Sequence, residues 1–182
     1  MGYVVLAGRW LTGLVFFAAA VSKVRGFDGF RRSVAALAPP LATWSAGVAG
    51  LVAAAELLVV ALIALPGTAA WGLAAALALD AGFIVVTVSA LRRGVQEPCR
   101  CFGATRQSLG PRDVVRDVLL GVVTAPALVG ASIGTPARSP AGWLVATVAG
   151  AVGALLVVRF DDLAELFFPG APARPDPTVR HV

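Results

Sequence analysis

The chain has 182 residues, of which 58% are hydrophobic and 14% are charged, and its formal net charge is +5. Soluble domains carry about 25% charged residues, so this composition excludes an ordinary water-soluble domain. The basic residues lie between long apolar runs, which is typical of membrane topology and not of a nucleic-acid-binding surface. The length leaves room for one helical bundle and no second domain.

Five apolar segments are long enough to cross a bilayer, whose hydrocarbon core matches about 20 residues of helix. They cover residues 4–22, 42–65, 69–91, 114–133 and 142–158. The first could instead be a cleaved signal peptide, but it lacks a preceding basic cluster. The fourth is the weakest, because Arg116 and Asp117 lie in its first turn and Pro126 should kink it. We expect an all-α integral membrane bundle over residues 1–160 and a flexible, proline-rich tail over residues 161–182.

The basic residues are divided unequally between the two faces of this bundle. The first loop contains Lys23, Arg25, Arg31 and Arg32, and the third contains Arg92, Arg93, Arg100, Arg106 and Arg112. With five spans, these two loops and the C-terminal tail share one face, which the positive-inside rule directs toward the cytoplasm. We therefore expect a multi-pass protein of a bacterial cytoplasmic membrane with an extracytoplasmic N-terminus.

Small residues recur at helical spacing in two of the spans. They are Ala146, Gly150 and Ala154 in the last span, and Gly47, Gly50 and Ala54 in the second. Because small residues let helix backbones approach in a membrane, both stripes predict contacts within the bundle.

Three ionisable residues, Arg9, Glu56 and Asp80, lie inside apolar segments, where each costs at least about 2.5–3.5 kcal/mol. Counted from the basic face, all three lie about 17–20 Å deep. This predicts a buried charge network in which Arg9 bridges one or both carboxylates. Such a network can simply lock the bundle. Alternatively, it can handle protons or a quinol, and a quinone would then be the cofactor.

The only two cysteines, Cys99 and Cys101, are separated by Arg100. A disulfide across one residue requires a bent backbone, because the Cα atoms must lie about 4.4–6.8 Å apart. Strained disulfides exchange readily, and basic neighbours favour the nucleophilic thiolate. The pair therefore predicts redox chemistry, with two structural thiols or a metal site as alternatives. Zinc prefers four ligands, and the only histidine is His181 in the distal tail.

The segment Cys99–Gly103 resembles the C-x-C-F-G signature of the MauE branch of the DoxX-like membrane proteins, named for methylamine utilisation. Further residues match this family in order along about residues 4–135. The family's first-helix pattern R-x3-G-x3-F-x5-K resembles Arg9, Gly13, Phe17 and Lys23 in this chain. The family's proline before the second helix corresponds to Pro39 or Pro40, and its second-helix acid corresponds to Glu56. Arg116 stands where the family has an Arg-Asn pair. Asp117 departs from the family's asparagine, which puts the hydrogen bonding around Arg116 in doubt.

The resemblance implies a four-helix DoxX-like core with a fifth transmembrane helix added. It also implies thiol–disulfide exchange that supports the maturation of exported disulfide-containing proteins, with Cys99 and Cys101 as the catalytic pair. Arg100, Lys23 and Arg116 would support this pair, and a thioredoxin-like or disulfide-containing protein would be the partner. The chain would then act as a thiol–disulfide oxidoreductase within membrane lipid. The alternatives are a non-catalytic assembly or anchoring subunit, and a small quinol- or proton-linked subunit.

The loop charges lead to a topology prediction. Alkaline phosphatase fused after Pro66 should be active, because that turn is expected outside the cytoplasm, whereas the same fusion after Arg174 should be inactive. A fluorescent protein that folds only in the cytoplasm should give the reverse pattern as a control. Active phosphatase at Arg174 would contradict the orientation and the cytoplasmic placement of the cysteines.

Overall fold

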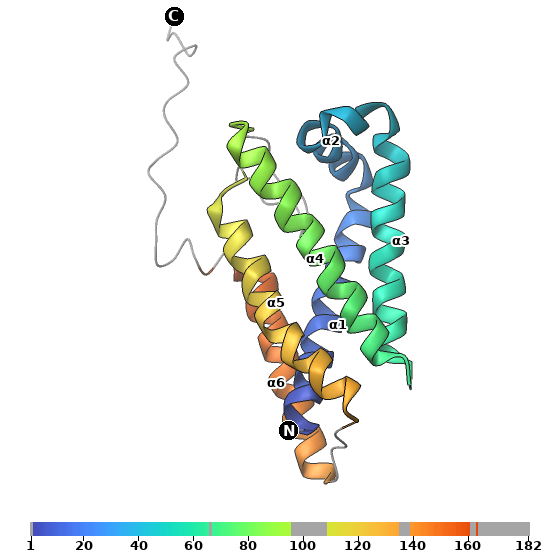
Figure 1. Cartoon of the computed structure of the whole chain (residues 1–182), viewed down its shortest axis with the longest axis vertical. Helices are drawn as coiled ribbons and strands as arrows, with labels where there is room; N and C mark the ends of the chain where they lie inside the picture. The colour runs from blue at the N-terminus through green and yellow to red at the C-terminus, as the bar shows by residue number, and fades with distance from the viewer. Residues whose placement is uncertain (1, 66, 96–108, 135–138, 161–162, 164–182) are drawn as a thin grey trace, which may run out of the picture.

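The computed structural model describes residues 2–65, 67–95, 109–134, 139–160 and 163. This part of the chain is helical and contains no strand. Five helical spans are long and apolar enough to cross a membrane (Figure 1). They are α1 (Gly2–Arg25), η1 (Pro39–Trp44) continuing into α3 (Ser45–Ala64), α4 (Ala69–Arg92), α5 (Pro111–Ser132) and α6 (Pro140–Val158). The five predicted spans are confirmed, and α5 continues through Pro126 without a break.

Four of these helices form a closed ring. Helix α1 packs against α3 and α5, and α4 packs against the same two helices from the other side. Helix α6 packs on the outside of the ring, along α1 (Figure 1). The expected architecture of a four-helix core with a fifth helix added is therefore the one that the structure shows.

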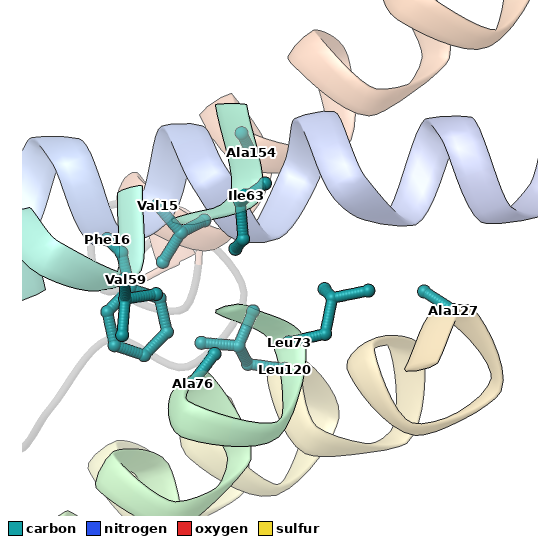
Figure 2. Packing of buried hydrophobic residues seen from close by; sticks show 9 residues of the cluster. All are labelled: Val15, Phe16, Val59, Ile63, Leu73, Ala76, Leu120, Ala127 and Ala154. Atoms are coloured by element: carbon teal, nitrogen blue, oxygen red, sulfur yellow. The ribbon is translucent and has the colours of Figure 1, made fainter. Parts of the chain in front are cut away.

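The ring encloses an apolar core to which every spanning helix contributes (Figure 2). Its buried members are Val15, Phe16, Val59, Ile63, Leu73, Ala76, Leu120, Ala127 and Ala154. Large apolar side chains also cover the outside, where Leu51 is 70% exposed and Leu144 is 67% exposed. An apolar exterior around the helices is what a lipid environment requires.

A short helix, α2 (Phe27–Leu37), lies between the first two spans where the sequence predicted only a loop. Its 11 residues are too few to cross a bilayer. Phe30, Val34 and Leu37 form its buried face, whereas Arg31 and Arg32 are exposed. The buried face packs against α3, and against Ala90 and Leu109. Helix α2 thus covers one end of the ring with an amphipathic surface.

The last helix approaches α1 closely at Gly150. A Cβ atom at this position would lie 2.6 Å from the Ala7 carbonyl oxygen and 2.7 Å from the Trp10 Cβ. Ala146 and Ala154 are also buried, so the small-residue stripe of α6 is a helix contact as predicted. The stripe predicted in the second span is wrong. A Cβ at Gly47 or Gly50 would meet nothing within 4 Å, and α3 instead buries the face with Ala49 and Ala53.

Gly150→Ala should destabilise the bundle by about 1–3 kcal/mol, because the added methyl overlaps the α1 backbone. Gly50→Ala is the matched control, since its methyl meets no neighbour. This control should be neutral or slightly stabilising, because alanine favours helix over glycine by about 1 kcal/mol. Thermal unfolding in detergent micelles measures both. Equal effects of the two substitutions would mean that α6 does not depend on this close approach.

Candidate functional site

Five charged side chains gather inside the ring, and each of the four ring helices supplies at least one. We call this group the buried charge cluster: Lys23 from α1, Glu56 from α3, Asp80 from α4, and Arg116 and Asp117 from α5. None of the five is more than 6% exposed. All of them line one small cavity of about 20 Å³. The cluster therefore occupies the interior of the ring, where charged groups are expensive.

The centre of the cluster is an ion pair between α1 and α3. Lys23 Nζ donates to Glu56 Oε1 at 2.7 Å, and both side chains are only 1% exposed. The ammonium also lies 5.2 Å from the ring centroids of Phe30 on α2 and Phe83 on α4. Such distances allow favourable cation–π interactions. One lysine thus connects four helices.

The second oxygen of Glu56 has no such partner. Glu56 Oε2 is buried without a hydrogen bond to the described residues. The carboxyl group lines the 20 Å³ cavity, whose volume is enough for about one water molecule. A single water in this cavity would satisfy Oε2.

The first turns of α5 supply the other half of the cluster. Arg116 donates from Nε and from Nη2 to Asp117 Oδ1, both at 3.1 Å. Its Nη1 lies 3.6 Å from Asp113 Oδ1, while Asp113 Oδ2 accepts from the Gly110 backbone N–H at 3.0 Å. Asp113 therefore both caps α5 and faces Arg116. The family's asparagine is replaced by Asp117, and this carboxylate is the partner of the arginine.

Asp80 reaches the cavity from α4 because the residue opposite it on α5 is Gly121, which has no side chain. A Cβ built on Gly121 would lie 3.2 Å from Asp80 Oδ2. With Asp80, the cluster contains three carboxyl groups and two cations. These five groups are electrically neutral together only when one carboxyl carries a proton or another cation joins them.

Arg9 does not belong to this cluster, so the predicted bridge between Arg9 and the carboxylates is wrong. Its Nη2 donates to the Ile63 carbonyl oxygen at 2.6 Å. Ile63 lies in the last turn of α3, where carbonyl groups have no partner within the helix. Thr68 Oγ1 satisfies the neighbouring Leu62 carbonyl at 2.7 Å. Arg9 and Thr68 therefore cap α3, and Arg9 does not line the cavity that Glu56 and Asp80 share.

The prediction that Arg9 lies at the same depth as Glu56 and Asp80 is wrong for a structural reason. Helix α1 continues past the predicted end of the first span to Arg25, and Lys23 lies within its last turn. Because Lys23 pairs with Glu56, the end of α1 meets the middle of α3, and the start of α3 around Ala49 packs beside α2. Arg9 is about 21 Å farther along α1 than Lys23, at 1.5 Å per residue. Equal residue counts from two helix ends therefore do not give equal depths.

The other predicted site residues have different outcomes. Lys23 was placed in the first loop, but its side chain is buried inside the ring and paired with Glu56. Arg116 stands beside the cluster's acids. Cys99, Arg100 and Cys101 lie outside the described residues. Sequence reasoning missed Asp113, Phe30 and Phe83. The i,i+3 spacing of Asp113 to Arg116 was a readable signal for the first of them.

A family model described as methylamine utilisation protein MauE matches residues 1–133, which end within one residue of the end of α5. The match thus covers the four-helix ring, α2 and the segment with both cysteines. No curated protein and no solved structure matches the chain.

Replacing one member of the Lys23–Glu56 pair should be far worse than replacing both. Glu56→Gln or Lys23→Met leaves a buried charge without its partner, and each should cost about 3–5 kcal/mol of unfolding free energy. The double variant Lys23→Met/Glu56→Gln should recover most of that loss. Unfolding in detergent micelles gives the coupling energy by a double-mutant cycle.

The control is the ion pair between Asp28 and Arg31, which is 4.0 Å long and largely exposed. Asp28→Asn should change stability by no more than about 0.5 kcal/mol. If the losses from the two single variants at Lys23 and Glu56 simply add in the double variant, the two groups are not coupled and the pair does not hold α1 to α3.

Proposed function

Since the chain belongs to the MauE family of methylamine-utilisation proteins, we propose that it takes part in thiol–disulfide exchange at the membrane. The exchange would support the maturation of exported proteins that contain disulfides. Cys99 and Cys101 are the proposed exchanging pair, and both fall within the residues that the family model matches. The observation that carries the proposal is this C-x-C-F-G motif inside a membrane bundle of that family.

The ends of the cysteine-bearing segment support the proposal. Val95 follows α4 and Leu109 precedes α5, and both contact the small core around Leu37 and Ala90. Both residues that flank the segment therefore lie at the end of the bundle covered by α2. We call this end, where α1 and α4 finish and α3 and α5 begin, the basic end; it carries Arg25, Arg31, Arg32, Arg92, Arg93 and Arg112.

A basic surrounding suits the chemistry. Positive charge near a cysteine favours the thiolate, which is the attacking form. Arg92, Arg93 and Arg112 flank the segment at its two ends, and Arg100 lies between the cysteines. The buried charge cluster lies inside the ring, in the half that is nearer to the basic end. Its proposed role is to hold the four helices together at this end, since its two cations are already engaged with carboxylates.

The proposed reaction is an exchange of two electrons and two protons. A thiolate of the pair attacks one sulfur of a partner's disulfide, that bond breaks, and the partner's other sulfur leaves as a thiolate and takes up a proton. The second cysteine then attacks the mixed disulfide. This releases the reduced partner and leaves a Cys99–Cys101 disulfide. The reverse sequence oxidises a partner dithiol, so the redox potentials of the two pairs set the direction.

The partner must reach the basic end of the bundle. Loop charge predicts that this end faces the cytoplasm, whereas exported proteins fold on the other side. A thioredoxin-like protein on the same side as the basic end is the partner that fits either orientation. The phosphatase fusions described above determine which compartment this partner occupies.

Cys99 and Cys101 should form a reversible intramolecular disulfide whose reduction potential lies above about −300 mV, below which structural disulfides fall. Strain destabilises the oxidised form and a favoured thiolate stabilises the reduced form, so both raise the potential. Alkylation trapping in native membranes, equilibrated with glutathione buffers of known ratio, measures it.

The single variants Cys99→Ser and Cys101→Ser provide the control. Each should lose the two-electron transition, and the remaining thiol should trap the partner as a mixed disulfide. The redox proposal fails if both thiols stay reduced at every physiological ratio and the double serine variant functions normally in cells. The chain would then be a non-catalytic assembly subunit.

A further inference from the structure

Arg9 is a charged residue in a part of the bundle that contains no acid. The segments 1–22, 57–79 and 118–160 contain no Asp or Glu. They supply nearly all of α1, the end of α3, the start of α4, most of α5 and all of α6. Together they include the end of the bundle opposite the basic end (Figure 1). No carboxylate of these segments can therefore neutralise Arg9.

The guanidinium group of Arg9 has unused capacity for an anion. Its hydrogen bond to the Ile63 carbonyl oxygen uses one of the five N–H groups that an arginine carries. A guanidinium presents these donors in a planar fork that matches carboxylate and phosphate oxygens. An anionic acceptor at Arg9 would therefore use further N–H groups and balance its charge.

Two cavities meet at Arg9. One, of about 270 Å³, is a groove between α1, α3 and α6, and its apolar walls include Trp10, Phe17, Val60 and Trp143. The other, of about 310 Å³, lies at the helix ends between Val5, Ala69, Gly130 and the turn residues Gly67 and Gly134. Arg9 lines both. A ligand seated on Arg9 can therefore place an apolar chain in the groove and a polar group among the helix ends.

Aromatic residues indicate how deep this place lies. Tyr3, Trp71 and Trp143 stand in the first turns of α1, α4 and α6, and Trp10 is one residue from Arg9. Tryptophan and tyrosine concentrate where lipid headgroups meet acyl chains. Arginine side chains also extend toward that boundary from deeper positions. Arg9 therefore sits where a phosphate and an acyl chain of the same lipid molecule would be found.

We propose that this place is a binding site for an anionic phospholipid, with the phosphate on Arg9 and an acyl chain in the groove of α1, α3 and α6. Charge complementarity selects an anionic lipid over a zwitterionic one. A quinone matches the site less well, because it has no charge to balance that of Arg9. The site also lies about 24 Å from the basic end, measured along α1 from Arg9 to Arg25. That separation would keep a quinone here away from chemistry at the basic end.

Tryptophan fluorescence tests this site directly in the full-length protein. Trp44 and Trp71 are 73% and 74% exposed, so both can be replaced by Phe to leave Trp10 and Trp143 as reporters on the groove. The protein is reconstituted in phosphatidylcholine vesicles that contain a small fraction of phospholipid brominated on its acyl chains. Brominated phosphatidylglycerol should quench these reporters at about a tenfold lower mole fraction than brominated phosphatidylcholine, as one charged hydrogen bond implies.

Three variants separate charge from folding. Arg9→Gln keeps a donor for the Ile63 carbonyl oxygen but should abolish the preference for phosphatidylglycerol. Arg9→Lys, which keeps the cation, should retain part of it. Arg25→Gln removes an exposed charge at the basic end and should leave the preference unchanged. The proposal is overturned if the two brominated lipids quench equally, if Arg9→Gln keeps the preference, or if equimolar ubiquinone displaces the brominated phosphatidylglycerol.

Discussion

Lipid tails are as apolar as leucine side chains, so burying leucine gives helices in a bilayer little reason to associate. This bundle meets that constraint with polar bonds inside the ring and close backbone contacts outside it. The Lys23–Glu56 pair is one of these polar bonds, and it joins α1 to α3 where both side chains are only 1% exposed. The buried Thr12–Thr124 hydrogen bond, 2.9 Å long, joins α1 to α5 in the same manner. Removing a partner would leave a polar group in hydrocarbon, and this penalty keeps the helices paired.

The same pair explains why a short amphipathic helix belongs to the fold. Helix α2 places Phe30 over the Lys23 ammonium and Leu37 beside Ala90 and Leu109. It therefore closes the ring above the ion pair and also contacts the residues next to the cysteine-bearing segment. One helix of 11 residues thus contacts both the buried charge cluster and the residues that flank that segment. The proposed exchange chemistry belongs to the segment between those flanking residues.

The spans could be predicted from the sequence because hydropathy is a local property, and all five were found. Pairing inside the bundle could not, because it depends on how far each helix is shifted along its neighbours. Lys23 was read as a surface residue since it follows the last apolar residues of the first span, yet α1 continues around it. Helix α2 carried a readable pattern in Phe30, Val34 and Leu37, but it is shorter than any span. The family motif indicated the cysteine chemistry, which the geometry of the described residues does not test.

Helix α6 stands apart from the other spans. It touches the ring mainly through α1, and the family match ends before it begins. A chain of four crossings returns to the side from which it started, so both of its ends share a compartment. With a fifth crossing, the start of α1 and the end of α6 lie on opposite sides. Helix α6 runs from Pro140 back toward the basic end, where the proposed exchange partner would also be found.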